Sequence, residues 1–144
     1  MQRQHPQRAT ATCAAAALLF AALAGSARCA EPGVPFPLHP GQSASLGPDV
    51  RVTLTAVQPA GSCPGGHREC VQVAPPQAHV EFASPPAASK QLVLPLLGRT
   101  SPPQAVGAWS LRVVDVAPFP FTHDDAAAAR VTVTLLLSAG SAKP

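Results

Sequence analysis

The chain has 144 residues, of which 12% are charged, and its ten Lys and Arg against seven Asp and Glu give a net charge of +3. Arg3, Arg8 and Arg28 precede residue 30, so the rest of the chain has seven basic and seven acidic residues. A nucleic-acid-binding protein needs a basic surface to meet phosphate, and this balance excludes that class.

The first 29 residues have the pattern of a secretory signal peptide. Arg3 and Arg8 precede a mostly apolar run over residues 9–24, which ends in small residues. A membrane-spanning helix needs about 20 apolar residues, and this run is shorter. We therefore expect a periplasmic or secreted protein with no transmembrane helix in its mature chain; an uncleaved membrane anchor is the alternative.

Signal cleavage fits after Ala24, Ala27 or Cys29, where small residues occur at the required spacing. A cut after Cys29 leaves Cys63 and Cys70 as an even pair, whereas a cut after Ala24 leaves a third thiol in an oxidising compartment. We therefore favour residues 1–29 as the signal peptide. Lipid attachment at Cys29 is the alternative.

The chain also has no Tyr, Asn or Ile, a bias typical of a GC-rich bacterial genome.

About 115 residues remain, enough for one domain with one core. Residues 30–48 form a proline-rich N-terminal arm, in which Phe36 and Leu38 share an apolar face and residues 43–46 have the pattern of an edge strand. Residues 49–140 contain short runs with alternating apolar side chains, separated by prolines.

The alternating runs predict strands and the direction of their side chains. In residues 50–57 the inward face is expected to hold four residues, and in the final run, residues 130–137, another four. These two inward sets are Val50, Val52, Leu54 and Ala56, and Val131, Val133, Leu135 and Leu137. Pro95 predicts an edge strand or bulge for residues 92–96. After Trp109, Leu111 and Val113 the alternation breaks at Val114, which predicts a β-bulge.

Six to eight such strands predict an all-β fold, a small antiparallel β-sandwich of immunoglobulin-like architecture. No helical period follows the leader. We expect residues 126–129, which follow Asp124 and Asp125, to be a loop; one helical turn is the alternative.

Cys63 and Cys70 bracket a glycine-rich turn that we expect to be closed by a disulfide bond. Cross-linking so short a loop stabilises a domain by about 2–3 kcal/mol. The alternative is a metal site of Cys63, His67 and Cys70, but a closed zinc site normally needs four ligands. The disulfide is the favoured interpretation.

This turn, with the strands around it, resembles a motif of an uncharacterised family of bacterial secreted β-domain proteins and lipoproteins. That motif reads Asp-Ser-Arg-Cys-Pro, a short gap, then Cys-Val-Trp-Ala-Gly, between a valine-rich strand and a late Val-x-Pro-x-Pro element. Here the matching stretches are residues 54–57, 62–64, 70–71 and 116–120. The motif is degenerate: Ala60 and Gly61 precede Ser62, and residues 72–74 read Gln-Val-Ala. The resemblance implies a fold and a compartment but no reaction.

Candidate chemistry is sparse. No nucleophile, phosphate-loop or metalloprotease motif is present. His123, Asp124 and Asp125 form the one dense polar cluster and, with His67, are the weak candidates for a metal site; a solvated turn is the simpler interpretation. We expect His39 and His79 to be exposed, with His79 beside Glu81.

The three other aromatic residues of interest have structural interpretations. We expect Trp109 to belong to the core rather than to a ligand platform. Phe119 and Phe121 are expected to close one end of the core.

The preferred function is therefore a non-catalytic secreted or periplasmic binding or structural module, monomeric and without a cofactor, whose partner is an envelope or extracellular protein. A periplasmic metal-binding protein is the first alternative. A hydrolase with an unrecognised site is the second.

Overall fold

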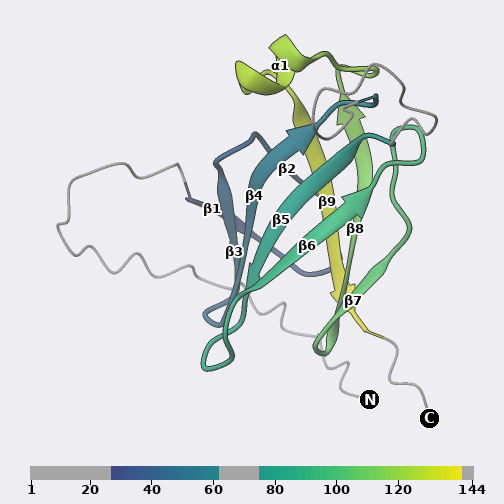
Figure 1. Ribbon diagram of the computed structural model, residues 1–144. Coiled ribbons are helices and arrows are strands. Elements are labelled where there is room, and N and C mark those ends of the chain that lie inside the picture. The colour runs from purple at the N-terminus through teal and green to yellow at the C-terminus, as the bar shows by residue number, and fades with distance from the viewer. Residues whose placement is uncertain (1–26, 62–74, 141–144) are drawn as a thin grey trace, which may run out of the picture.

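The computed structural model describes residues 27–61 and 75–140, and the ribbon in Figure 1 shows them as strands arranged in two layers. Within these residues there are nine strands and one short helix. In chain order they are β1 (Ala27–Ala30), β2 (Phe36–Leu38), β3 (Ser43–Leu46), β4 (Val50–Gln58), β5 (Gln77–Ala83), β6 (Lys90–Pro95), β7 (Gln104–Val106), β8 (Trp109–Ala117), α1 (His123–Ala127) and β9 (Thr132–Ala139).

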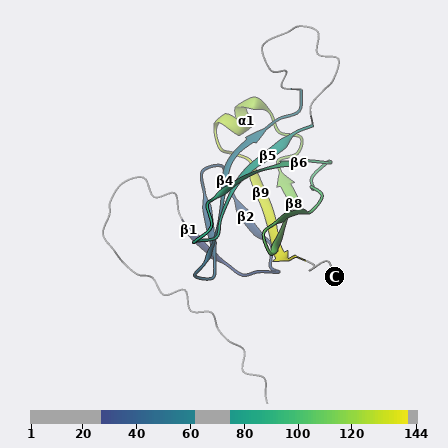
Figure 2. The same ribbon diagram turned by 60° about the horizontal axis from the view of Figure 1, so that its bottom comes forward.

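The strands form two sheets that face each other, as the turned view in Figure 2 also shows. One sheet has the order β1-β3-β4-β5-β6 and the other β2-β9-β8-β7. Among the described strands, β1 and β3 pair in parallel and all other pairs are antiparallel. The predicted all-β architecture is confirmed, with two facing sheets as a sandwich requires and nine described strands rather than six to eight.

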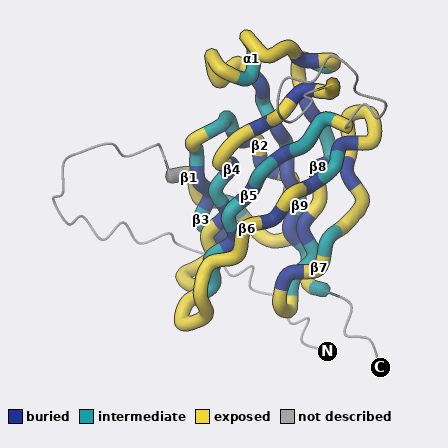
Figure 3. The backbone as a smooth tube through the Cα atoms, in the orientation of Figure 1, coloured by how far each residue is buried: buried dark blue, intermediate teal, exposed yellow. Residues whose placement is uncertain are grey.

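A single apolar core lies between the sheets, built from side chains that alternate inward along each strand. Figure 3 shows the result as buried positions along the strands and exposed positions in the turns. In β9 the side chains of Val133, Leu135 and Leu137 are fully buried. Val131, just before this strand, is fully buried too. The predicted inward face of the final strand is therefore confirmed.

Two bulges change which side chains face inward. In β8 the register shifts between Val113 and Asp115, which confirms the predicted bulge and lets Val116 return to the core. A second bulge lies between Leu54 and Ala56 in β4. Because of it, Ala56 is exposed and Val57 is buried, so the prediction that Ala56 faces inward was wrong.

The segment before residue 49 is integrated into both sheets rather than lying outside them. Phe36 and Leu38 are buried as expected, and β2 pairs with β9. The strand at Ser43–Leu46 is confirmed, but β1 covers it on the side away from β4, so β3 is not at the edge. The edge position expected for the strand with Pro95 is confirmed, because β6 ends its sheet.

Helix α1 extends into the segment that was expected to be a loop. For Ala126 and Ala127 the loop prediction was wrong and the alternative of a helical turn is confirmed, whereas residues 128 and 129 form a turn. A local capping arrangement supplies what hydrophobic periodicity does not. Thr122 is the N-cap, and its side chain and that of Asp125 bond each other's backbone N–H, which satisfies donors at the helix start. Ala126 packs against the core. The helix therefore closes one end of the sandwich (Figure 1).

Three of the four cysteines, Cys13, Cys63 and Cys70, lie outside the described residues, as does His67. The predicted Cys63–Cys70 disulfide therefore stays a prediction. Cys29 lies in β1 and is not a free thiol.

In the part of the chain that the structure describes, no helix has both the length and the apolar character needed to cross a membrane.

The central position of β9 predicts where the fold is most sensitive. Leu135 is fully buried and stands opposite Phe36 on one side and Val113 on the other. Leu135→Ala should lower the free energy of unfolding, measured in urea, by about 2–5 kcal/mol through lost burial and the cavity it leaves. Val93→Ala is the matched control, because Val93 is 44% exposed. Similar losses for both variants would contradict this core.

Candidate functional site: an apolar pocket between two hairpins

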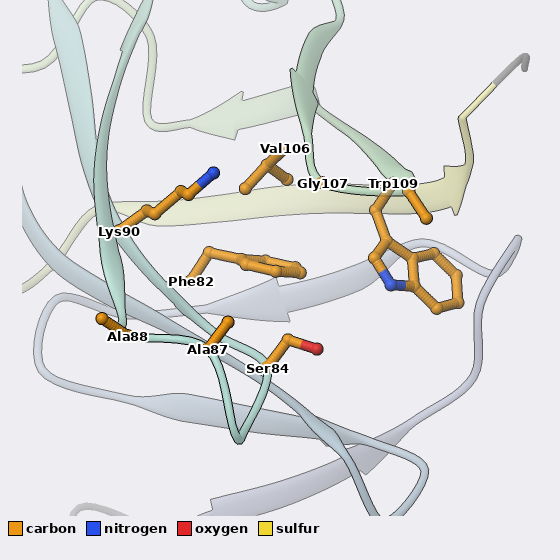
Figure 4. Close-up of a pocket in the computed structure, with 9 residues that line it drawn as sticks. Phe82, Ser84, Ala87, Ala88, Lys90, Val106, Gly107 and Trp109 are labelled. Carbon is orange, nitrogen blue, oxygen red and sulfur yellow. The ribbon is translucent and has the colours of Figure 1, made fainter.

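A pocket of about 170 Å³ lies between the hairpin β5–β6 and the hairpin β7–β8. These hairpins belong to opposite sheets, at the end of the sandwich away from α1 (Figure 1). We call it the hairpin pocket. Its lining, drawn in Figure 4, consists of Phe82, Ser84, Ala87, Ala88, Lys90, Val106, Gly107, Ala108 and Trp109.

The pocket is the last inward layer of the sandwich. Phe82 stands opposite Lys90 at the end of the β5–β6 ladder, and Val106 stands opposite Trp109 at the end of the β7–β8 ladder. Directly opposed residues in an antiparallel pair share a face of the sheet. Phe82 and Val106 are buried, so their partners also stand on the inward faces.

The four inward residues do not fill the space between them, because small residues make up the turns. Ala87 and Ala88 belong to the β5–β6 turn, and Gly107 and Ala108 to the β7–β8 turn. Gly107 has a φ of +57°, a left-handed conformation that glycine adopts at low cost and that a tight two-residue hairpin requires. The side chains at these turns are therefore too small to cover the layer.

Hydrogen bonds beyond the ladder hold the β7–β8 hairpin in place. The buried Ser101 hydroxyl accepts a 2.8 Å bond from the Val113 N–H, and the Ser101 N–H donates to the Val113 carbonyl at 3.0 Å. At the turn itself, the Gly140 N–H donates to the Ala108 carbonyl at 2.7 Å. One side of the hairpin pocket is thus tied to both β8 and the end of β9.

The lining is largely apolar with a few polar groups. Phe82 is buried, Trp109 is half-buried, and Lys90 is exposed. In Figure 4 the Phe82 ring lies between Lys90 and Trp109, and the Lys90 side chain extends toward Val106. Among the described lining residues Lys90 is the one charged side chain, and no ion pair joins it to any other described residue.

The predicted cluster of His123, Asp124 and Asp125 lies on α1, where the Asp125 carboxylate bonds protein groups rather than forming part of a metal site. Its Oδ2 atom accepts 3.0 Å bonds from the Thr122 N–H and the Thr122 hydroxyl, and its Oδ1 atom accepts a 3.3 Å bond from Arg130 Nε. Within residues 27–61 and 75–140, no three His, Cys, Asp or Glu side chains group closely enough to hold a metal ion. The Asp125 carboxylate therefore serves as a helix cap.

The hydrogen bonds that Asp125 accepts also change its acidity. The backbone N–H of Thr122, its hydroxyl and the Arg130 guanidinium all favour the charged carboxylate and lower the pKa of Asp125. The opposing effect of burial is smaller than that of the Thr122 bonds.

The two histidines that were expected to be exposed are both half-buried. His39 Nδ1 lies 3.2 Å from the Val131 carbonyl oxygen, so this side chain links the segment after β2 to the start of β9. His79 faces away from the core as expected, but its Nε2 atom is buried and accepts or donates no bond within the described residues. Glu81 bonds Gln91 rather than His79, accepting from the amide at 2.8 Å.

Trp109 is in contact with the core, as expected, but the structure also places it at the pocket, which the sequence interpretation missed. A signal was present on β6. Lys90 is in phase with the buried Leu92 and Leu94, so a charged residue occupies a position where the alternation calls for an apolar one. Phe119 is half-buried and Phe121 buried, in agreement with a role at one end of the core.

No protein-family model, curated protein or solved structure matches this chain. The resemblance to the bacterial secreted family therefore rests on its short motifs, and the immunoglobulin-like comparison stays one of architecture.

The capping role of Asp125 predicts a pH-dependent contribution to stability. Its folded pKa is lowered, so its contribution is complete above the unfolded pKa of about 3.9 and is lost as the pH falls through the folded value. Wild type should therefore be more stable than Asp125→Ala at pH 6, and the difference in urea unfolding should shrink below about pH 4. The control is Asp124→Ala, which removes an exposed carboxylate from the same first turn without removing a cap, and it should lose less stability than Asp125→Ala. A difference that is constant down to pH 2 would contradict the cap.

Proposed function

We propose that this protein is a non-catalytic binding module of the bacterial periplasm or exterior, and that its binding site is the hairpin pocket. The observation that carries the proposal is an inward layer that the protein's own side chains leave unfilled. A sandwich normally buries its inward positions against the facing sheet. Here Phe82 and Trp109 border a space that is open at the end of the molecule.

The size and composition of this space support a small ligand. Ligand sites are concave, mostly apolar and carry a few placed polar groups. A dry apolar cavity of about 150 Å³ accommodates benzene, and the hairpin pocket has about 170 Å³. One aromatic ring or a branched aliphatic group of similar size therefore fits.

The use of the other polar side chains supports a binding rather than a catalytic role. Asp125 caps α1, and His39 contacts the backbone at Val131. Ser101, which precedes β7, bonds the backbone of Val113 in the bulged strand β8. Each of these groups is explained by the fold it stabilises.

Export and the disulfide complete the proposal. The leader supports secretion, and an oxidising compartment would permit one disulfide bond among Cys29, Cys63 and Cys70. Strand β1 bears on the cleavage point, because Ala27–Ala30 pairs with β3 along its whole length. A cut after Cys29 would remove most of β1 and expose the edge of β3, and a cut after Ala27 would remove the first residue of β1. We therefore propose the cut after Ala24, which keeps Cys29 in the mature chain; Cys29 is not a free thiol, so its retention does not count against this cut.

Binding in the pocket can be tested with an uncharged one-ring probe, benzyl alcohol. Trp109 is the chain's only tryptophan and there is no tyrosine, so protein fluorescence reports directly on the site. The probe should change the emission saturably in wild type. Ala87→Leu places methyl groups in the pocket and should weaken binding by roughly tenfold or more, since ring and side chain compete for one space.

The matched control for this test is Ala105→Leu. Ala105 is exposed on β7, next to Val106, but does not line the pocket. It should bind as wild type does. A probe response that does not saturate, or equal binding by Ala87→Leu and wild type, would overturn the proposed site.

Mass spectrometry of the protein exported by a bacterial host tests the compartment and the cut together. The expected species begins at Gly25 and retains β1. Its mass should be two hydrogens lower than that of the reduced chain for each disulfide formed. A species that begins at Ala30 would contradict the retention of β1, and unprocessed protein in the cytosol would contradict export.

A further inference from the structure

We infer that the hairpin pocket binds a free one-ring carboxylate, with the ring against Phe82 and Trp109 and the carboxylate at the Lys90 ammonium. This inference rests on the proposed function and names the chemistry of its ligand. It comes from the position of one lysine in the strand register.

Lys90 occupies an inward position that an apolar residue would normally take. Its partner Phe82 is 4% exposed, and Leu92, two residues along the same face, is 7% exposed. Lys90 itself is exposed, so its ammonium stays hydrated at the edge of the pocket while its apolar stem can lie along these surfaces. No described side chain is paired with Lys90, so its ammonium is available to an anionic ligand.

The other polar groups at the pocket agree with an anion. The indole nitrogen of Trp109 is a donor and never an acceptor, and the Ser84 hydroxyl can donate. In Figure 4 the indole nitrogen lies on the side of the Trp109 ring that faces Phe82 and Ser84. None of the described lining residues is acidic. The site therefore has donors and a positive charge, which match a carboxylate and disfavour an amine.

The apolar walls define the rest of the ligand. The space between Phe82, Val106 and Trp109 accommodates about one ring, and aromatic pairs gain stabilisation beyond the area they bury. The carboxylate must then reach Lys90 at the edge of the same space, which favours a short linker between ring and acid. Hydrocinnamate, a phenyl ring with a three-carbon acid chain, has this form and is the probe for the test.

The experiment titrates the mature protein with hydrocinnamate, with neutral 3-phenylpropanol and with cationic 3-phenylpropylamine, following Trp109 fluorescence at fixed ionic strength. Hydrocinnamate should bind with a Kd on the order of 1 mM or tighter, as expected for a ligand of this size. It should bind roughly tenfold tighter than the alcohol, because a hydrogen bond to a charged group is added. The amine should bind most weakly.

Three variants assign the charge effect to Lys90. Lys90→Met keeps the apolar stem but removes the ammonium, and should weaken hydrocinnamate roughly tenfold while leaving the alcohol unchanged. Lys90→Arg should retain the preference for the acid. The control is Arg112→Met, which removes one positive charge from the exposed face of β8, and it should bind hydrocinnamate as wild type does.

The outcomes separate this inference from the proposed function. Equal affinity for the acid and the alcohol, with Ala87→Leu still weakening both, would overturn the carboxylate but retain the pocket. No saturable binding of any of the three compounds would overturn both. Equal weakening by Lys90→Met and Arg112→Met would overturn the contact with Lys90.

Two further results bear on the source of the ligand and on Lys90 itself. Tighter binding of a short peptide that ends in phenylalanine than of hydrocinnamate would overturn the assignment to a free acid.

An inward lysine on an edge strand can also prevent edge-to-edge association between two copies of the protein. If Lys90→Met self-associates but binds hydrocinnamate as wild type does, that role replaces the ligand role.

Discussion

The packing of two inward-facing sets of apolar side chains is the interaction on which the rest of the structure depends. Each fully buried valine or leucine contributes about 1.5–3 kcal/mol relative to exposure. The fold thus depends on apolar and polar side chains alternating along each strand. Where this alternation is interrupted in β4 and β8, a bulge returns the following apolar side chain to the core. Where one sheet faces the other, most inward residues are apolar. Lys90, at the layer where the two hairpins diverge, and Gln104, opposite the buried Leu111, are polar residues in inward register.

The two ends of the sandwich differ in how far the core is covered. At one end, α1 and Phe121 cover the core, and the cap at Thr122 and Asp125 fixes where the helix starts. At the other end the turns consist of alanine, glycine, serine and proline, which leave Phe82 and Trp109 bordering open space. A small domain gains stability by closing such a space, so a layer that stays open supports a binding role for it.

Much of the fold follows from local sequence, and the remainder depends on contacts between distant residues. Alternation predicted β9 and the bulge at Val113, because side-chain direction has a period of two. It failed at Ala56, since the bulge in β4 is set by pairing with β5. It also missed α1, whose five residues show too little periodicity. The pocket could not be derived locally, because it requires β5 and β6 of one sheet to face β7 and β8 of the other.

The central claim is that a ring enters the layer between the two hairpins. The most direct measurement is an NMR experiment on the labelled protein with bound hydrocinnamate, recording nuclear Overhauser effects from the ligand's ring protons. Our account predicts contacts with the methyl groups of Val106, the ring of Phe82 and the indole of Trp109. Ring contacts confined to another part of the molecule, or none at saturating ligand, would contradict it.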